Sequence, residues 1–258
     1  MNWAAMKTVE FGKQNNDVIM LLHGGGLSWW NYKAEAELLK NRYHVVLPIL
    51  DGHAGSGNDF ISIEKNASRL ISFIDNEFGG SVLLIGGLSL GAQILVEMLT
   101  QRNSICLNAV IESASVIPSR LTNALIKPMF SLSYGLVKKK CFAQMQFDYL
   151  HIRKDLFEDY YRDTSQISKE NMIAFLEANT SYEVKPNLQD VHAKVRILVG
   201  EKEQKKMICS AEQLHKALPG SILEIKKGLY HGEYSINHPE EYTKELLDMM
   251  CYILNKSA

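Results

Sequence analysis

Short runs of consecutive apolar residues, rich in β-branched side chains, recur along the chain and are separated by helical patterns. An uninterrupted apolar run is typical of a strand covered on both faces, as in a parallel sheet, whereas a half-exposed strand alternates. The alternation of such strands with helices predicts an α/β fold with right-handed crossovers. The predicted strands are Val18–Leu22, Val45–Leu47, Val82–Ile85, Ala109–Ile111 and Val195–Val199, with Ile222–Ile225 nearer an edge.

The helical patterns between these strands place apolar residues three and four positions apart, which gathers them on one face of each helix. Such a face packs against the sheet and leaves the polar face in water. The last helix is expected to open near Pro239, because proline is favoured in a first turn. The faces expected to be buried are Ala67, Leu70, Ile71, Ile74 and Phe78; Ile94, Leu95, Met98 and Leu99; and Tyr242, Leu246, Met249, Met250 and Ile253.

One stretch, residues 117–186, contains helical patterns and no convincing strand. Ser168 is its clearest local signal, as a predicted helix N-cap. We expect this stretch to form a helical cap, or lid, inserted into a core made of residues 1–116 and 187–258. The large apolar and aromatic residues of the cap are Met129, Phe130, Tyr134, Phe142, Met145, Phe147 and Tyr149.

The overall composition suits a soluble domain, with 46% hydrophobic residues and a net charge of -1. The near-zero charge gives no sign of a nucleic-acid or membrane partner and favours a small-molecule substrate. Four scattered cysteines show no metal-binding spacing and are expected to be free thiols. The stretch from Met1 to Lys13 lacks a signal-peptide pattern, so we expect a cytoplasmic protein. The sequence does not indicate an oligomeric state.

The pentapeptide Gly87-Leu88-Ser89-Leu90-Gly91 follows a predicted buried strand and precedes a predicted helix. In that position the pattern describes a tight elbow that holds its serine in a strained backbone conformation. The flanking glycines let the strand and the helix approach closely, because no Cβ intervenes. The structural alternative is a serine that only caps the helix. Ser89 is therefore the candidate nucleophile.

A second glycine-rich segment, His23-Gly24-Gly25-Gly26, follows the strand that ends at Leu22. Glycines after a strand free the backbone to direct an N–H group at a developing oxyanion. We assign the Gly25 N–H as one donor and the Leu90 N–H, next to the nucleophile, as the other. A phosphate-binding loop is disfavoured, because neither of the usual glycine-loop patterns follows.

The candidate general base is His231, which lies between the last predicted strand and the last helix. A base must reach the nucleophile from a loop at the carboxyl ends of the strands, and His231 satisfies that requirement. The remaining histidines belong to the glycine loop, to a turn, to a helix start or to polar surroundings. The chain order of nucleophile before histidine is typical of one class of serine triad.

The third member should be a carboxylate that holds the imidazole in one tautomer and stabilises its positive charge. Glu203, in the segment after the strand ending at Val199, is our assignment. Glu201 in the same segment and Glu112, directly after the strand Ala109–Ile111, remain alternatives.

The order of these motifs resembles the α/β-hydrolase superfamily, in its lid-bearing esterase, lactonase and C–C hydrolase-like branch. The resemblance extends to Asp51–Ser56, which looks like a family loop that shapes the site without doing chemistry. It implies a mostly parallel central sheet flanked by helices, with a helical lid insertion. The sequence departs from the family in having Glu203 where aspartate is usual, Leu88 before the nucleophile and Ala92 in place of a second glycine. A serine nucleophile disfavours epoxide-hydrolase or dehalogenase chemistry.

The function expected from the residues and the resemblance is hydrolysis of a small or medium carboxylic ester through an acyl-enzyme on Ser89. This chemistry requires no cofactor and no metal. A thioesterase, a lactonase, a C–C bond hydrolase or an acyltransferase would use the same triad, since fold and triad do not separate them. A ligand sensor that keeps the fold with little turnover is the alternative from another class.

Overall fold

Seven strands form one sheet, in the order β1-β3-β2-β4-β5-β6-β7, in the computed structural model of the protein. The structure describes residues 5–254, and the side chains of residues 5–250. Neighbouring strands are parallel except β1, which pairs antiparallel with β3. The strands are β1 (Thr8–Phe11), β2 (Val18–Leu22), β3 (His44–Pro48), β4 (Val82–Leu88), β5 (Cys106–Glu112), β6 (Lys194–Gly200) and β7 (Ile222–Lys226).

Each strand expected from the apolar runs is present, which confirms the predicted mostly parallel sheet. The strand that the sequence does not predict is β1. It has 4 residues, all half-buried, and lies at the edge of the sheet. A short edge strand of this kind carries no continuous apolar run, so its pairing with β3 is decided by the tertiary fold.

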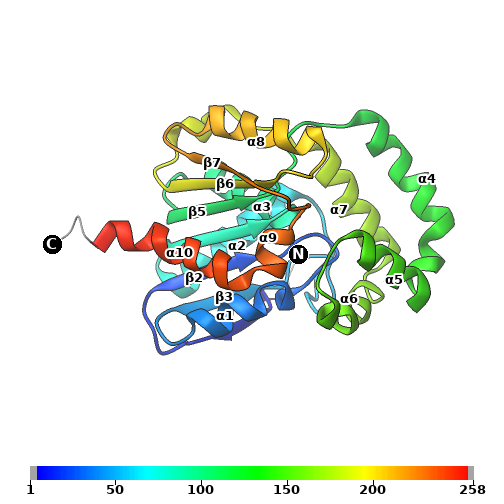
Figure 1. The fold of residues 1–258 in the computed structure, drawn as a ribbon, viewed down its shortest axis with the longest axis horizontal. Coiled ribbons are helices and arrows are strands. Elements are labelled where there is room, and N and C mark those ends of the chain that lie inside the picture. Colours follow the sequence, from blue (N-terminus) through cyan, green and yellow to red (C-terminus); the bar gives the residue numbers. More distant parts are fainter. Residues whose placement is uncertain (1–4, 255–258) are drawn as a thin grey trace.

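Helices cover both faces of the sheet and make a three-layer core (Figure 1). Apolar residues of α2, α3 and α8 pack on one face, and those of α1 and α10 pack on the other. Within β2, Met20 and Leu22 face the first group while Ile19 and Leu21 face the second. The helices before β5 and after the segment 117–185 are η1 (Trp29–Tyr32), α1 (Lys33–Leu39), α2 (Ile63–Phe78), α3 (Leu90–Gln101), η3 (Pro186–Asp190), α8 (Lys205–Ala217), α9 (Glu233–Asn237) and α10 (Pro239–Leu254).

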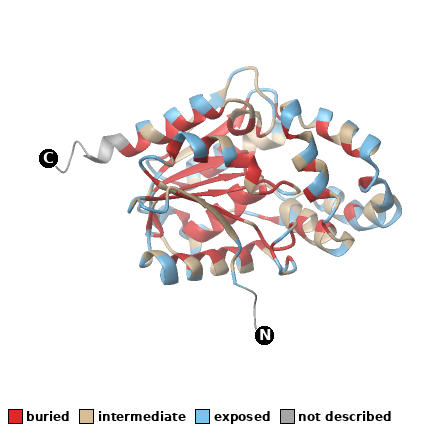
Figure 2. Ribbon diagram, turned by 90° about the horizontal axis from the view of Figure 1, so that it is seen from below, coloured by how far each residue is buried: buried red, intermediate tan, exposed pale blue. Residues whose placement is uncertain are grey.

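The inner strands β2 to β6 are buried along most of their length, whereas the edge strands β1 and β7 are not (Figure 2). Helix α3 is buried on nearly every side, and α1 and α2 are buried mainly on the side that faces the sheet. Every described residue of the predicted helix faces is buried, except Phe78. Phe78 is half-buried at the end of α2, where its ring packs edge-on against His44 at 5.6 Å. The Ile253 side chain lies outside the described residues.

The chain between β5 and β6 is helical wherever it has regular secondary structure. Ser168 caps α7 by accepting a hydrogen bond of 3.1 Å from the Asn171 N–H, as predicted. In Figure 1 these helices lie together beyond one end of the sheet. They are α4 (Arg120–Val137), α5 (Lys140–Tyr149), η2 (Lys154–Leu156), α6 (Phe157–Thr164) and α7 (Lys169–Ser181). Within the described chain, no helix combines the length and the hydropathy needed to cross a membrane.

Candidate active site

Ser89 occupies the single position between the end of β4 and the start of α3. Its backbone has φ 52° and ψ −111°, a conformation that residues other than glycine rarely adopt. The Ser89 N–H is held by the Glu112 carbonyl of β5 at 2.9 Å. Its side chain makes no capping bond to α3, so the hydroxyl is free to serve another partner.

The glycines on either side of Ser89 are required by close backbone contacts. A Cβ on Gly91 would lie 2.2 Å from the Leu22 carbonyl oxygen, and one on Gly87 would lie 2.6 Å from the Gly91 carbonyl oxygen. Both separations are below any van der Waals contact. The strand, the turn and the helix can therefore meet at Ser89 only when both positions lack a side chain.

His231 reaches Ser89 from the loop between β7 and α9. Its Nε2 lies 3.0 Å from Ser89 Oγ, and its Nδ1 lies 2.6 Å from Oε2 of Glu203. A carboxylate only accepts hydrogen bonds, so Nδ1 is the protonated nitrogen and Nε2 faces the hydroxyl as an acceptor. This is the arrangement that proton removal from Ser89 needs.

Glu203 is buried, and its carboxylate has several partners besides His231. Its Oε1 accepts a hydrogen bond from Ser113 Oγ at 2.6 Å and another from the Gly200 N–H at 2.8 Å. Burial raises the pKa of Glu203, but the hydrogen bond and charge of His231 lower it, and so do the bonds from Ser113 and Gly200. The pKa is lowered overall, so the group is a carboxylate at neutral pH.

The other two candidate acids do not hydrogen-bond His231. Glu201 is exposed and accepts a bond from the Gly228 N–H at 2.8 Å. Glu112 is buried, and its Oε1 accepts from the Ser235 N–H at 3.2 Å. Burial, with a smaller contribution from the charge of Glu203, raises the pKa of Glu112 to about 7. The structure therefore places Glu203 beside the imidazole, and not Glu201 or Glu112.

The pKa of His231 is set by opposing influences. Desolvation is the largest and lowers it, whereas the hydrogen bond and charge of Glu203 and the charge of Glu112 raise it. The raising influences prevail, so the pKa of His231 is above that of an ordinary histidine. The carboxylate thus stabilises the imidazolium that would form when His231 takes a proton.

The glycine loop after β2 comes close to the start of α3. The Gly24 N–H donates to Asn31 Oδ1 at 3.2 Å, and the Gly26 N–H donates to His53 Nε2 at 3.0 Å. Among the described residues the Gly25 and Leu90 N–H groups have no such partner. A Cβ on Gly25 would lie 3.5 Å from the Leu90 Cβ, so the two residues are neighbours.

Two buried histidines hold this loop in place, a role that the sequence does not reveal. Nδ1 of His53 bonds the Asp51 carbonyl, and Nε2 of His23 accepts from the Leu50 N–H at 3.1 Å. Burial lowers the pKa of His53 to about 4 and lowers that of His23 well below its ordinary value, so both rings are neutral. Ser113, which holds Glu203, is likewise visible only in the structure, although its φ of 56° marks it as unusual.

Ser89 and His231 line a cavity of about 160 Å³ together with Gly24, Gly25 and Gly232. Its other walls are apolar. A cavity of about 380 Å³ adjoins it, because Leu150 and His231 line both. Of residues 117–186, Leu150 and Ile152 line the smaller cavity, whereas Met129 and Met145 are exposed. The apolar side chains around Ser89 are Leu27, Leu88, Leu150, Ile152 and Ile236.

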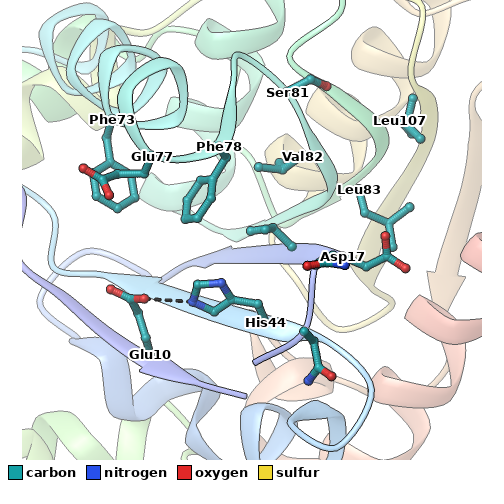
Figure 3. Close-up of a pocket in the computed structure, with 13 residues that line it drawn as sticks. Glu10, Asp17, His44, Phe73, Glu77, Phe78, Ser81, Val82, Leu83 and Leu107 are labelled. Atoms are coloured by element: carbon teal, nitrogen blue, oxygen red, sulfur yellow. Dashed lines mark hydrogen bonds and ion pairs between the residues drawn. The ribbon is translucent and has the colours of Figure 1, made fainter. Parts of the chain in front are cut away.

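A more open cavity, of about 650 Å³, lies at the other end of the sheet, where β2, β3 and β4 begin. Figure 3 shows a hydrogen bond between His44 and Glu10 in it, which measures 2.8 Å. Ser81, also on its wall, lies away from this pair (Figure 3). The cavity therefore has no nucleophile paired with its histidine. Within the described residues, no group of three or more histidine, cysteine or acidic side chains is placed to bind a metal ion.

A sequence model described as the alpha/beta hydrolase family matches residues 19–244. No curated protein matches the chain by sequence. Among solved structures, a thermophilic esterase from Thermogutta terrifontis has a TM-score of 0.79 and 15% identity, covering 96% of this chain and 93% of its own. The enol-lactonase from Burkholderia xenovorans LB400 has a TM-score of 0.79 and 15% identity, with coverages of 95% and 96%. MenH from S. aureus has a TM-score of 0.74 and 16% identity, with coverages of 96% and 98%. At these identities the likeness concerns the fold.

Proposed function

Because this chain belongs to the alpha/beta hydrolase family, we propose that it is a serine hydrolase that cleaves a small or medium carboxylic ester through an acyl-enzyme on Ser89. The observation that carries the proposal is the unbroken line of hydrogen bonds from Ser89 Oγ through the His231 ring to Glu203. A nucleophile, a base and an orienting carboxylate in this order match the requirements of acyl transfer.

In the first half of the reaction, His231 Nε2 takes the proton of Ser89 Oγ while the oxygen attacks the carbonyl carbon of the ester. The imidazolium is stabilised by the Glu203 carboxylate at 2.6 Å. When the tetrahedral intermediate collapses, the bond to the leaving oxygen breaks and His231 returns the proton to it. The alcohol departs and the acyl group remains on Ser89.

In the second half, His231 Nε2 takes a proton from a water molecule, whose oxygen attacks the acyl carbon. Collapse of the second intermediate breaks the bond to Ser89 Oγ, which recovers its proton from His231. The carboxylic acid is released and the free enzyme is restored. No other proton carrier is needed, because the Nδ1 proton stays on His231 throughout and is donated in a hydrogen bond to the Glu203 carboxylate.

The Gly25 and Leu90 N–H groups are proposed to bind the oxyanion in both halves. They are adjacent across the turn, and no described residue accepts a hydrogen bond from them. Leu90 is the first residue of α3, so the positive end of the helix dipole adds to the field at this point. Removing one such donor costs about 3 kcal/mol of transition-state stabilisation in comparable enzymes.

The cavity around Ser89 supports a compact acyl group. A space of about 160 Å³ with apolar walls accepts a short acyl chain and holds no charged group to pair with an anion. We propose that residues 117–186 act as the lid, because Leu150 and Ile152 of this segment form part of the wall. The adjoining cavity beside His231 would receive the leaving alcohol, since His231 must protonate it.

The test of this function combines covalent labelling with turnover. We expect an activated fluorophosphonate to label Ser89, with no labelling of Ser89→Ala and strong loss in His231→Ala. The matched control is Ser68→Ala, at a half-buried serine on α2, and it should be labelled like the parent. A chromogenic ester series should show highest kcat/KM for short acyl chains. Folded protein that resists labelling would rule out the proposal, and faster turnover of thioesters or lactones would correct its substrate.

A further inference from the structure

The cavity of about 380 Å³ beside His231 is built from three parts of the chain. Its wall combines aromatic and aliphatic side chains with one lysine. A leaving alcohol that receives its proton from His231 would extend into this space. The helical segment between β5 and β6 contributes Tyr149, Leu150 and His151, the chain after β6 contributes Lys202, Glu203, Gln204 and Met207, and the loop after β7 contributes Tyr230 and His231.

Lys202 directly precedes Glu203, and its backbone is fixed beside the loop that carries His231. The Lys202 N–H donates to the Leu229 carbonyl at 2.9 Å. The ammonium lies 4.9 Å from the centre of the Tyr230 ring. A cation over a ring keeps its own hydrogen-bond donors available to another partner. Lys202 is therefore a positive group on the cavity wall that can still donate hydrogen bonds.

No acidic side chain among the described residues forms an ion pair with Lys202. Glu203, the acid on the same wall, already accepts hydrogen bonds on both oxygens. Glu201 and Glu233 accept from the N–H groups of Gly228 and Tyr230, each at 2.8 Å, and neither acid lines the cavity. The positive charge of Lys202 is thus available to a ligand.

The start of α8 adds to the positive potential at this wall. Gln204 is the N-cap of α8 and Met207 lies in its first turn, and both line the cavity. A first turn usually favours acidic residues because of the helix dipole, but here it contains Lys205 and Lys206 and no acid. The Gln204 side chain makes no capping bond, so its amide can donate to a ligand beside Lys202.

The His151 and Tyr230 rings form a flat aromatic part of the wall. Their centroids lie 3.9 Å apart and their planes differ by 9°. The His151 carbonyl accepts a hydrogen bond from Asn237 Nδ2 at 2.7 Å, which fixes the backbone that carries the ring. A surface of this kind favours a flat or apolar group, because aromatic rings stack and bury apolar area.

We propose that the alcohol part of the substrate carries a carboxylate, which pairs with Lys202 while the body of the alcohol lies against the aromatic wall. This inference rests on the proposed function and specifies the leaving group of its ester. The smaller cavity around Ser89 contains no lysine or arginine, so the anion is assigned to the alcohol and not to the acyl chain. A cationic alcohol fits poorly, because the wall offers no unpaired carboxylate.

The test compares 4-nitrophenyl acetate with 3-carboxy-4-nitrophenyl acetate, whose leaving groups differ by one carboxylate. The quantity measured is the ratio of kcat/KM for the anionic ester to that for the neutral ester. Lys202→Gln should lower this ratio about fivefold, mainly through KM, because an exposed ion pair is of modest strength. Lys202→Glu should lower it about twentyfold, since it adds repulsion, whereas Lys202→Arg should stay within about twofold of the parent. Added salt should lower the ratio of the parent and leave that of Lys202→Gln unchanged.

The matched control is Lys216→Gln, at an exposed lysine in the last turn of α8, and it should keep the ratio of the parent. Because the neutral ester is the internal reference of each variant, a partial loss of folded protein does not alter the ratio. An unchanged ratio in Lys202→Gln, or an equal decrease in Lys216→Gln, overturns this inference while turnover of the neutral ester upholds the proposed function. Turnover of neither ester by the folded parent overturns both.

Discussion

Nδ1 of His231 lies 2.6 Å from Oε2 of Glu203, which makes the glutamate after β6 the carboxylate that orients the imidazole. The remaining oxygen of Glu203 is fixed by Ser113 and by the Gly200 N–H. Both oxygens are thus hydrogen-bonded, and the ring has one orientation in which Nε2 faces Ser89. Three strands, β5, β6 and β7, contribute to this arrangement through the loops that follow them.

Replacing the acid tests this arrangement. Glu203→Gln removes the negative charge that stabilises the imidazolium, so kcat/KM on a chromogenic ester should fall by about a thousandfold or more. Glu112→Gln and Glu201→Gln, the matched controls, should stay within about a few-fold of the parent, because neither group hydrogen-bonds His231. A loss in Glu112→Gln as large as in Glu203→Gln would show that the acid is misassigned.

The pH dependence of activity follows from the raised pKa of His231. The base must be neutral to accept the proton of Ser89, so kcat/KM should fall as pH decreases through that pKa. We expect the midpoint of this acid limb above about 6.5, the ordinary value for histidine. In Glu203→Gln the residual activity should have its midpoint at lower pH, since the main raising influence is gone. An unchanged midpoint in that variant would contradict the coupling.

Replacing glycine by alanine should have opposite effects on stability at Gly91, in the crowded elbow, and at Gly135, where there is open space. Gly91→Ala would place Cβ 2.2 Å from the Leu22 carbonyl oxygen. Backbone must move to relieve this overlap, at a cost of about 3 kcal/mol or more, with loss of activity. Gly135→Ala, on α4, meets no atom within 4 Å and should stabilise the protein by about 0.5–1 kcal/mol. Urea unfolding and ester turnover of the two variants measure both effects.

A buried acid away from the reacting atoms predicts how stability changes with pH. Burial, with a smaller contribution from the charge of Glu112, raises the pKa of Glu35 to about 8. Its Oε1 has no hydrogen-bond partner among the described residues. Between the unfolded pKa and the folded one, the folded state keeps a proton that the unfolded state has lost. The contribution of Glu35 to stability therefore decreases as pH rises through this window.

Glu35→Gln should remove that decrease, because glutamine does not ionise. We expect the variant and the parent to be equally stable near pH 4, and the variant to be more stable by about 2–4 kcal/mol at pH 8. Thermal or urea unfolding across this range makes the comparison. A constant difference between the two proteins at all pH values would show that folding does not raise the pKa of Glu35.

Much of the fold and of the candidate site is predictable from the sequence because the signals are local. A run such as Val18–Leu22 must be buried on both faces, and this requirement alone indicates a covered parallel strand. Ser89 is recognised because its flanking glycines and its place between strand and helix belong to one short segment. The order of Ser89 before His231 along the chain is also typical of one class of serine triad, which identifies the candidate base.

Other features depend on contacts between distant segments, which the tertiary structure decides. The sequence leaves three carboxylates in competition for His231, and only the packing of the loop after β6 against Ser113 places Glu203 there. The hydrogen bond from the Gly26 N–H to His53 Nε2 joins residues that are 27 positions apart in the sequence. Leucine is a residue type that usually lies in a core. Leu132 is nevertheless 91% exposed, because α7 packs against the other face of α4. Local patterns determine which elements form, whereas the side chains that meet at the site are selected by how those elements pack.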